Sequence, residues 1–198
     1  LRARFSIHSS GVPGTVAGLI YALDNYGKLS LKEVLQPAID LAREGFEVSV
    51  DLSESLQARQ KTLKKDPASR AYFYKPDGAG YQPGEVLAQP DLAKTLIRIA
   101  AKGRAGFYQG ETADLLIAQM QRNNGLMSLE DLANYKVVER TPVCGIYRDN
   151  KVCAMPPPSS GGVHMIQMLN ILEGWDLASL GHNSAAYIHR LVESMRRA

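Results

Sequence analysis

The sequence lacks the features of several protein classes. It has no apolar run near the roughly 18 residues that a helix needs to cross a bilayer, so we expect no membrane span. Its net charge is only +3 with scattered lysines and arginines, which gives no basis for a nucleic-acid partner. No signal peptide is recognisable, because the basic start Leu1–Phe5 has no apolar region after it. Apolar residues make up 45% and charged residues 22%, which is ordinary for a globular protein.

The motifs of common metal and catalytic sites are also missing. The four histidines are dispersed, and no His-x-x-x-His or Cys-x-x-Cys pair occurs, so we expect neither a metal nor a cofactor. There is no Gly-x-Ser-x-Gly elbow and no Walker-type phosphate loop. A nucleophile pair of Cys153 and His164 has no family signature around it, and we do not favour it. The residues by themselves show no complete catalytic set.

Only two cysteines are present, Cys144 and Cys153, and they flank the turn signal Arg148–Asn150. A hairpin register that places them opposite each other allows a disulfide, whereas a slip of one residue puts them on opposite faces. We expect free buried thiols. The number of cysteines does not indicate a compartment.

Most of the sequence has apolar residues at helical spacing. Apolar residues from Val16 predict a helix that stops at Gly27, and Ser30 with Glu33 forms a capping box for a second helix. Pro37 is expected to bend that helix or to shorten its first part. Further helices are expected after Ser49 or Asp51, from a cap at Asp91 to Gly103, from Glu111 to Gln121, in a short turn after Ser128, from Val163 to Gly174, and after Asn183 or Ser184.

The remaining segments predict loops and one hairpin. Residues 66–90 are rich in Pro, Gly and Tyr, and are predicted to be a loop with at most short strand pieces near Tyr72–Tyr74. Val137–Val138 and the segment from Cys144 to Met155 read as strands around an Asp149–Asn150 turn. A two-stranded ribbon is marginal alone, so the hairpin lies on the helices or its sheet is completed by residues outside the chain.

We interpret residues 1–198 as a single partial domain, mostly α with a small β portion. It comprises a helical region over about 12–134, a hairpin and turn over about 137–162, and helices over about 163–198. The chain does not begin with methionine and it ends inside a helical pattern. We therefore expect a piece of a longer protein.

The stretch Met155–His164, MPPPSSGGVH, joins the hairpin to the next helix. Three prolines hold the backbone extended, and two serines and two glycines then release that stiffness. Free N–H groups and the helix dipole point the same way at the start of this helix, which is compatible with an anion cradle. The other interpretation is a capped strand-to-helix turn, in which Ser159 and Ser160 have a structural capping role.

Eight motifs follow one another along the chain. They are SGVPGTVAG at 10–18, QPA at 36–38 with AREGF at 42–46, LAKTL at 92–96, GFYQG at 106–110, VERTP at 138–142, YR at 147–148, MPPPSSGG at 155–162, and E-x-x-R-x-A at 193–198. Their order resembles the large subunit of the γ-glutamyltranspeptidase family. The likeness covers essentially the whole chain, and PPPSSGG is its most specific motif.

The resemblance implies the large-subunit part of an αββα N-terminal-nucleophile hydrolase sandwich. In this family a proenzyme cleaves itself before a threonine, which becomes the nucleophile of the small subunit, with its own α-amino group as base. The γ-glutamyl group of glutathione or a related γ-glutamyl compound then passes through an acyl-enzyme to water or an amino acid, while backbone N–H groups hold the oxyanion. The implied partner is the small subunit of the same proenzyme, and the implied location is periplasmic or secreted.

Little of that site is expected in this chain. None of its threonines stands in a Thr-Thr-His or Thr-Ser-His context, and neither Arg2 nor Arg4 lies in the Arg-Glu-x-Ala-Pro context of the family's carboxylate-binding arginine. We assign no catalytic residue and expect the fragment alone to be inactive. Four residues are candidates for supporting a pocket: Ser159, Ser160, Gly161 and Gly162.

Two alternatives stay open beside this interpretation. One is a related acylase with the same fold, either cephalosporin acylase-like or poly-γ-glutamate processing. The other is a non-catalytic helical scaffold. If the chain folds alone, we expect the surface that the small subunit should cover to promote homo-oligomers or poor solubility.

Overall fold

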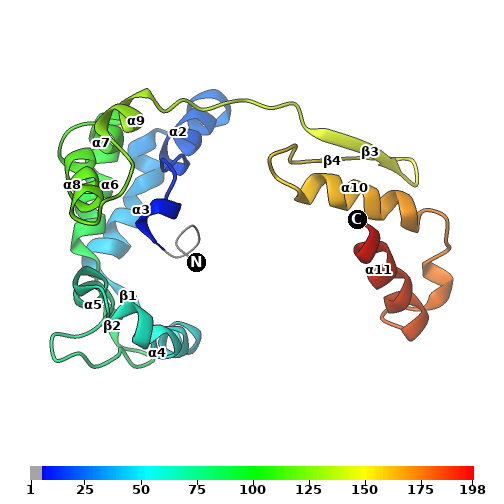
Figure 1. The fold of residues 1–198 in the computed structure, drawn as a ribbon, viewed down its shortest axis with the longest axis horizontal. Coiled ribbons are helices and arrows are strands. Elements are labelled where there is room, and N and C mark those ends of the chain that lie inside the picture. Colours follow the sequence, from blue (N-terminus) through cyan, green and yellow to red (C-terminus); the bar gives the residue numbers. More distant parts are fainter. Residues whose placement is uncertain (1–5) are drawn as a thin grey trace. The chain divides into compact units, whose positions relative to one another are not determined.

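The computed structural model describes residues 6–198, which form a mostly helical chain with two small antiparallel sheets (Figure 1). The fold divides into two compact units: unit 1 ends at Val137, and unit 2 is Val138–Ala198. This boundary falls where the sequence changes from helical patterns to the predicted hairpin. The single partial domain over residues 1–198 stays a prediction. Within residues 6–198, no helix is both long and apolar enough to cross a bilayer.

Unit 1 is built from helices and one short strand pair. Its elements are η1 (Ile7–Ser9), α2 (Thr15–Tyr26), α3 (Leu31–Glu44), β1 (Phe46–Glu47), α4 (Val50–Leu63), α5 (Pro67–Phe73), β2 (Val86–Leu87), α6 (Pro90–Lys102), α7 (Ala105–Tyr108), α8 (Glu111–Arg122) and α9 (Leu129–Asn134). The capping box predicted for α3 is confirmed, because Glu33 N donates to Ser30 Oγ at 3.3 Å and Ser30 N donates to Glu33 Oε2 at 2.9 Å. Pro37 lies inside α3 and does not shorten it.

The loop prediction for residues 66–90 is wrong in its first part, where α5 forms. The Asp66 carboxylate caps this helix by accepting from Ser69 N at 2.8 Å. Pro67 occupies the first helical position, where a missing N–H leaves no bond unmade. Tyr72–Tyr74 therefore forms no strand, and the short strand of this region is β2, paired with β1.

The cap prediction for α6 is also wrong. Gln89 stands at the N-cap position and makes no side-chain cap bond, while Asp91 lies in the first turn. Gln89 N instead donates to Ala42 O at 2.7 Å, so the start of α6 is held by the end of α3. A long-range backbone contact has replaced the local cap that the sequence suggested.

The core of unit 1 surrounds Tyr108, which is 1% exposed. Its hydroxyl donates to Pro13 O and accepts from Ala17 N at 3.2 Å, so it holds the start of α2. Its ring stacks on Tyr135, with centroids 5.9 Å apart. Leu132 is 0% exposed in the same cluster. Parts of α2, α7, α8 and α9 are thus packed around one aromatic side chain.

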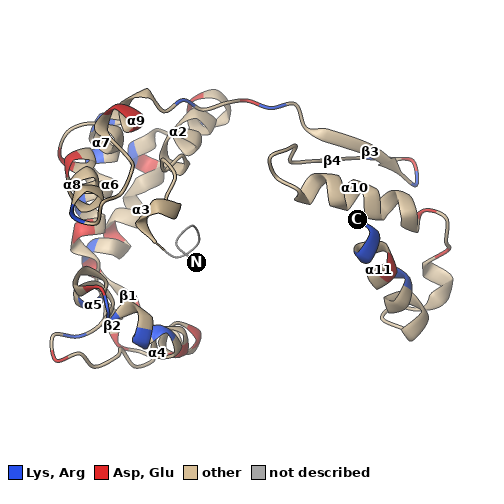
Figure 2. Ribbon diagram, in the orientation of Figure 1, with Lys and Arg blue, Asp and Glu red and all other residues tan. Residues whose placement is uncertain are grey.

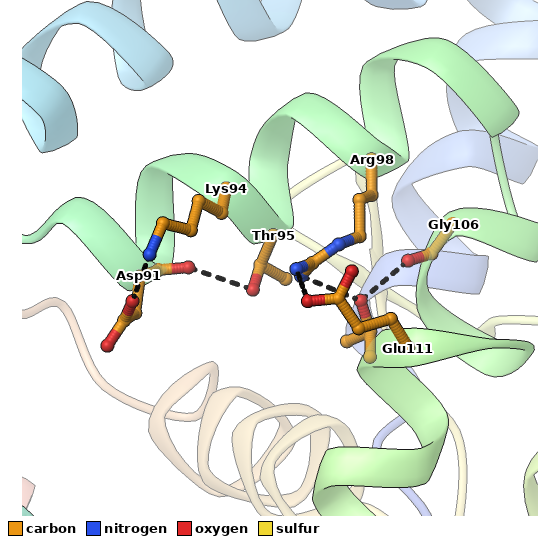
Figure 3. A network of polar contacts seen from close by, with 7 residues as sticks. Asp91, Lys94, Thr95, Arg98, Gly106 and Glu111 are labelled. Atoms are coloured by element: carbon orange, nitrogen blue, oxygen red, sulfur yellow. Dashed lines mark hydrogen bonds and ion pairs between the residues drawn. The ribbon is translucent and has the colours of Figure 1, made fainter.

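In a second region of unit 1, α6 packs on α3 and on α7. The contact between α3 and α6 buries Ile39, Ala42, Ala93 and Ile99. Figure 3 shows Arg98 of α6 reaching Glu111 of α8. Arg98 Nη1 also donates to Thr112 Oγ1 at 3.4 Å, and Thr112 Oγ1 donates to Gly106 O at 2.9 Å. A Cβ at Gly106 would overlap the Arg98 carbonyl oxygen, so the absence of a side chain lets α7 approach α6.

Unit 2 contains β3 (Val143–Tyr147), β4 (Asn150–Ala154), α10 (Gly161–Leu172), η2 (Ala178–Leu180) and α11 (Ala185–Arg197). The predicted hairpin is confirmed from Val143 onward, whereas Val137–Val138 forms no strand. One face of the hairpin packs on α10, and α11 packs on α10 in turn. At Gly145 an added Cβ would lie 2.7 Å from Ile166 Cγ2, which shows how closely helix and hairpin pack.

The two cysteines form a disulfide across this hairpin. Register places Cys144 directly opposite Cys153, and their Cα atoms are 4.1 Å apart. Both residues are exposed, on the face opposite Gly145 and α10. The prediction of free buried thiols is therefore wrong, because only the strand register decides which face each cysteine occupies.

Candidate functional site

The four predicted pocket-supporting residues lie between β4 and the first turn of α10. Ser159 N donates to Pro156 O at 3.2 Å, so Pro157 and Pro158 lie inside a turn, and the prediction that the three prolines hold an extended backbone is wrong. Ser160 is the N-cap residue of α10, and its carbonyl accepts from His164 N at 3.0 Å. The Ser160 side chain makes no cap bond, and Ser159 precedes the cap position. The predicted capping role of the two hydroxyls is therefore wrong.

The two glycines differ in what surrounds them. Gly162 is buried, and a Cβ there would overlap the Met155 carbonyl oxygen and lie 3.0 Å from Ala154 Cβ. A Cβ at Gly161 would meet only Ser159 Oγ, at an ordinary 3.7 Å. Neither glycine has a positive φ. Gly162 is required by the close approach of α10 to the end of β4, and not by backbone freedom.

A groove of about 690 Å³ lies beside this turn, entirely within unit 2. Its walls are largely apolar and include Pro142, Met155 and Pro156, while Arg140 and Ser159 contribute polar groups. Such a groove can hold an apolar group with a polar or anionic end. Of the four predicted residues only Ser159 lines it, and the pocket-supporting role of all four stays a prediction.

The carboxyl groups with lowered pKa values have structural explanations. Hydrogen bonds from the cap residue or the first turn hold the pKa of three helix-capping carboxyls below their ordinary values: Glu33, Asp66 and Asp131. Hydrogen bonding from Lys75 lowers the pKa of Glu85, and hydrogen bonding from Arg197 and then Arg196 lowers that of Glu193. These shifts come from helix caps and ion pairs, which also perturb pKa values outside active sites.

The remaining candidate residues concern metal binding, the N-terminal arginines and the two cysteines. Within residues 6–198, no three His, Cys, Asp or Glu side chains gather as metal ligands. Arg2 and Arg4, to which the sequence gave no role, lie outside the described residues. Cys153 lines the groove as half of a disulfide, which was not predicted from the sequence. The only feature of the sequence that could have indicated the disulfide was the spacing of the two cysteines around a turn.

Known proteins of one family resemble the chain in sequence and in fold. The crystal structure of Helicobacter pylori gamma-glutamyltranspeptidase matches it with a TM-score of 0.94 and 43% identity, covering 98% of this chain and 56% of that chain. The fold is therefore that of a mostly helical part of an N-terminal-nucleophile hydrolase. Residues 2–198 match the Gamma-glutamyltranspeptidase family. The chain belongs to this family, as the motifs of its sequence predicted.

Curated relatives show the same relationship. The chain is 46% identical over 191 residues to the glutathione hydrolase proenzyme of Escherichia coli K12, covering 96% of this chain and 33% of that protein. It is 44% identical over 187 residues to the Acylase ACY 1 proenzyme of Pseudomonas sp. SE83, covering 94% of this chain and 33% of that protein. The chain thus spans about one third of the length of these relatives.

Proposed function

We propose that this chain is part of the large subunit of a γ-glutamyltransferase or glutathione hydrolase. The parent protein transfers the γ-glutamyl group of glutathione to water or amino acids through a threonine acyl-enzyme. The observation that carries this proposal is the 46% identity to a glutathione hydrolase proenzyme along nearly the whole chain. Because no threonine here stands in the family's nucleophile context, the nucleophile belongs to a part of the parent outside these residues.

The contribution of this chain to that chemistry is structural. Acyl transfer requires a nucleophile, a base and donors for the oxyanion, held together in fixed geometry. The close packing at Gly162 fixes the turn that precedes α10, and Ser159 lies on the groove beside it. We propose that this turn supports the wall of the substrate pocket in the parent protein.

Hydrolysis of γ-glutamyl-p-nitroanilide tests the main proposal. The 198-residue chain should show no turnover, while the parent that includes the downstream segment should cleave itself and then turn the substrate over. Replacing the threonine at the cleavage point by alanine should abolish both. Turnover proportional to the amount of the 198-residue chain would contradict the proposed position of the nucleophile. A parent that never cleaves itself would support the non-catalytic scaffold instead.

The pocket-supporting role has its own test in the parent protein. Ser160→Ala combined with Gly161→Ala is expected to slow maturation or turnover. The side chain of Gly161→Ala has room, so the double variant should stay folded. Unchanged maturation and unchanged turnover would contradict the pocket-supporting role of the turn. The proposed activity of the parent would not be affected by that result.

An acylase is a second candidate for the parent, because the identity to the Acylase ACY 1 proenzyme is nearly as high. Either a cephalosporin acylase-like or a poly-γ-glutamate-processing enzyme would keep the same mechanism with another acyl group. Comparing kcat/KM of the parent for a γ-glutamyl amide and for a cephalosporin side-chain amide separates the two. Preference for the cephalosporin would replace the glutathione hydrolase proposal.

The proposed location of the parent is periplasmic or secreted, and its proposed partner is the small subunit of the same proenzyme. The Cys144–Cys153 disulfide supports export, because disulfides persist mainly in oxidising compartments. Cell fractionation with thiol labelling tests this. A parent found in the cytosol with both thiols reduced would contradict it.

We also propose that the 198-residue chain alone forms homo-oligomers. Unit 2 exposes three apolar side chains at helical spacing along α11, namely Ile188, Val192 and Met195. Light scattering at high concentration should detect dimers or larger species. A clean monomer would count against the proposal.

A further inference from the structure

A cleft of about 600 Å³ lies in unit 1 beside the junction of α4 and α5. Three cationic side chains line it, Lys64, Arg70 and Lys75, together with Tyr74 and Tyr81. Figure 2 shows Lys and Arg positions on α4 and in the segment that follows α5. Volumes of this size are typical of small-molecule sites. The lining combines cations with aromatic rings, so its chemistry differs from that of the apolar groove in unit 2.

Lys64 is held in the wall of the cleft. It caps the C-terminus of α4, and its ammonium donates to Gln60 Oε1 at 3.2 Å and lies 4.7 Å from the ring centroid of Tyr74. Tyr74 is 3% exposed, and its hydroxyl donates to Leu56 O at 2.6 Å. A buried, anchored ring therefore positions the Lys64 charge. Among the described residues no carboxylate pairs with it.

Arg70 approaches the cleft from α5. A Cβ at Gly78 would lie 3.6 Å from Arg70 Nη2, so the guanidinium reaches the turn that follows α5. Within residues 6–198 this guanidinium makes no hydrogen bond and no ion pair, although it has five donors. The helix that carries it begins at an Asp66 cap and a proline, directly after the segment that follows Lys64.

The third cation is already partnered. Lys75 Nζ pairs with Glu85 at 2.6 Å and lies 5.8 Å from the ring centroid of Tyr81. The other nearby carboxylates, Asp66 and Asp77, accept backbone N–H groups and do not line the cleft. Among the described residues, the Arg70 guanidinium and the Lys64 ammonium therefore line the same cleft without a carboxylate partner.

We propose that this cleft binds a small anion with two carboxylate or phosphate groups, and that Arg70 and Lys64 are its anion-contacting residues. A guanidinium offers a planar fork that matches carboxylate and phosphate oxygens, while an ammonium acts as a point charge. The ring of Tyr81 forms an apolar wall for the body of the ligand. This proposal does not rest on the proposed function of the parent.

The test is calorimetric titration of the 198-residue chain with two probes, inorganic pyrophosphate and citrate, at low and at high salt. At least one probe should bind saturably at one site per chain, and more weakly at high salt because exposed charges are screened. Tighter binding of pyrophosphate assigns the site to phosphates, and tighter binding of citrate assigns it to carboxylates. No saturable binding of either probe would overturn the proposal.

Three charge-neutralising variants locate the site. Arg70→Gln and Lys64→Gln should each weaken binding about tenfold, because each removes a charge-assisted contact. Lys61→Gln is the matched control, since it lies in the last turn of α4, changes the net charge equally and does not line the cleft. Far-UV circular dichroism confirms that each variant is folded. Equal weakening by all three variants would show general electrostatic attraction and would overturn the proposed site.

Discussion

Unit 1 and unit 2 differ in how much apolar surface each buries by itself. Of the sixteen buried hydrophobic side chains found among residues 6–198, Leu172 alone belongs to unit 2. Unit 1 closes a core around Tyr108 and Leu132. Unit 2 instead has a disulfide across its hairpin and a close contact between α10 and β4 at Gly162. We therefore expect covalent and steric constraints to contribute more to the stability of unit 2 than to that of unit 1.

The exposed apolar residues of unit 2 are consistent with the proposal that the chain is part of a longer parent protein. Ile146 is 59% exposed on the outer face of the hairpin, and Met155 is 67% exposed beside the groove. The curated relatives are about three times as long as this chain. We therefore expect the constraints within unit 2 to matter most when the rest of the parent is absent. Trp175 is the only tryptophan of the chain and lies in unit 2, so its fluorescence reports this unit separately.

The largest effect is expected from opening the core of unit 1. Leu132→Ala removes a side chain that is 0% exposed and should lower the free energy of unfolding by about 2–5 kcal/mol, because it leaves a cavity. The matched control is Leu129→Ala in the same helix, where the side chain is 48% exposed. Urea unfolding followed by far-UV circular dichroism measures both. Equal losses would show that unit 1 has no closed core.

Removing the disulfide should give the next largest effect, confined to unit 2. Replacing Cys144 and Cys153 together by serine should lower the free energy of unfolding of unit 2 by about 2–3 kcal/mol, as expected for a closed loop of nine residues. Urea unfolding followed by Trp175 fluorescence measures it. A reducing agent added to the unmodified chain should reproduce the shift. An unchanged fluorescence midpoint would show that unit 2 does not depend on the bond.

Filling the contact between α10 and β4 should cost less. Gly162→Ala forces a methyl group against the Met155 carbonyl oxygen and should destabilise unit 2 by about 1–3 kcal/mol through overpacking. Gly161→Ala is the control, since its Cβ has room and alanine favours the helix. Trp175 fluorescence again reports the transition. Similar midpoints for the two variants would contradict the steric role of Gly162.

The smallest effect concerns the acid stability of unit 1. Hydrogen bonds from the side chain and backbone of Ser128 lower the pKa of Asp131 in the folded state. Its contribution is therefore complete above the ordinary aspartate pKa of about 3.9 and is lost as the pH falls through the lower folded value. Asp131→Asn should flatten this part of the pH dependence of unfolding. Glu130→Gln, one residue away, should leave it unchanged, and the same flattening in both variants would contradict the assignment.

Local patterns of sequence predicted most helix boundaries. The cap at Ser30, the stop at Gly27 and the cap at Ser128 were all recognisable, because each involves groups within about four residues of one another. The α5 helix was missed because the surrounding Pro, Gly and Tyr obscured the Asp66 cap and the proline after it. A cap followed by proline at the first helical position was the signal that could have found it.

The sequence by itself determined the family of this protein, its mostly helical character and the place of its hairpin. Only the tertiary structure decided that Cys144 and Cys153 are bonded, that Gly162 and not Gly161 is sterically required, and that Lys64 and Arg70 face one cleft. The physical reason is the distance along the chain over which each kind of interaction acts. Caps and periodicity act within one turn of chain, whereas strand register, close packing and shared clefts depend on how separate elements are brought together.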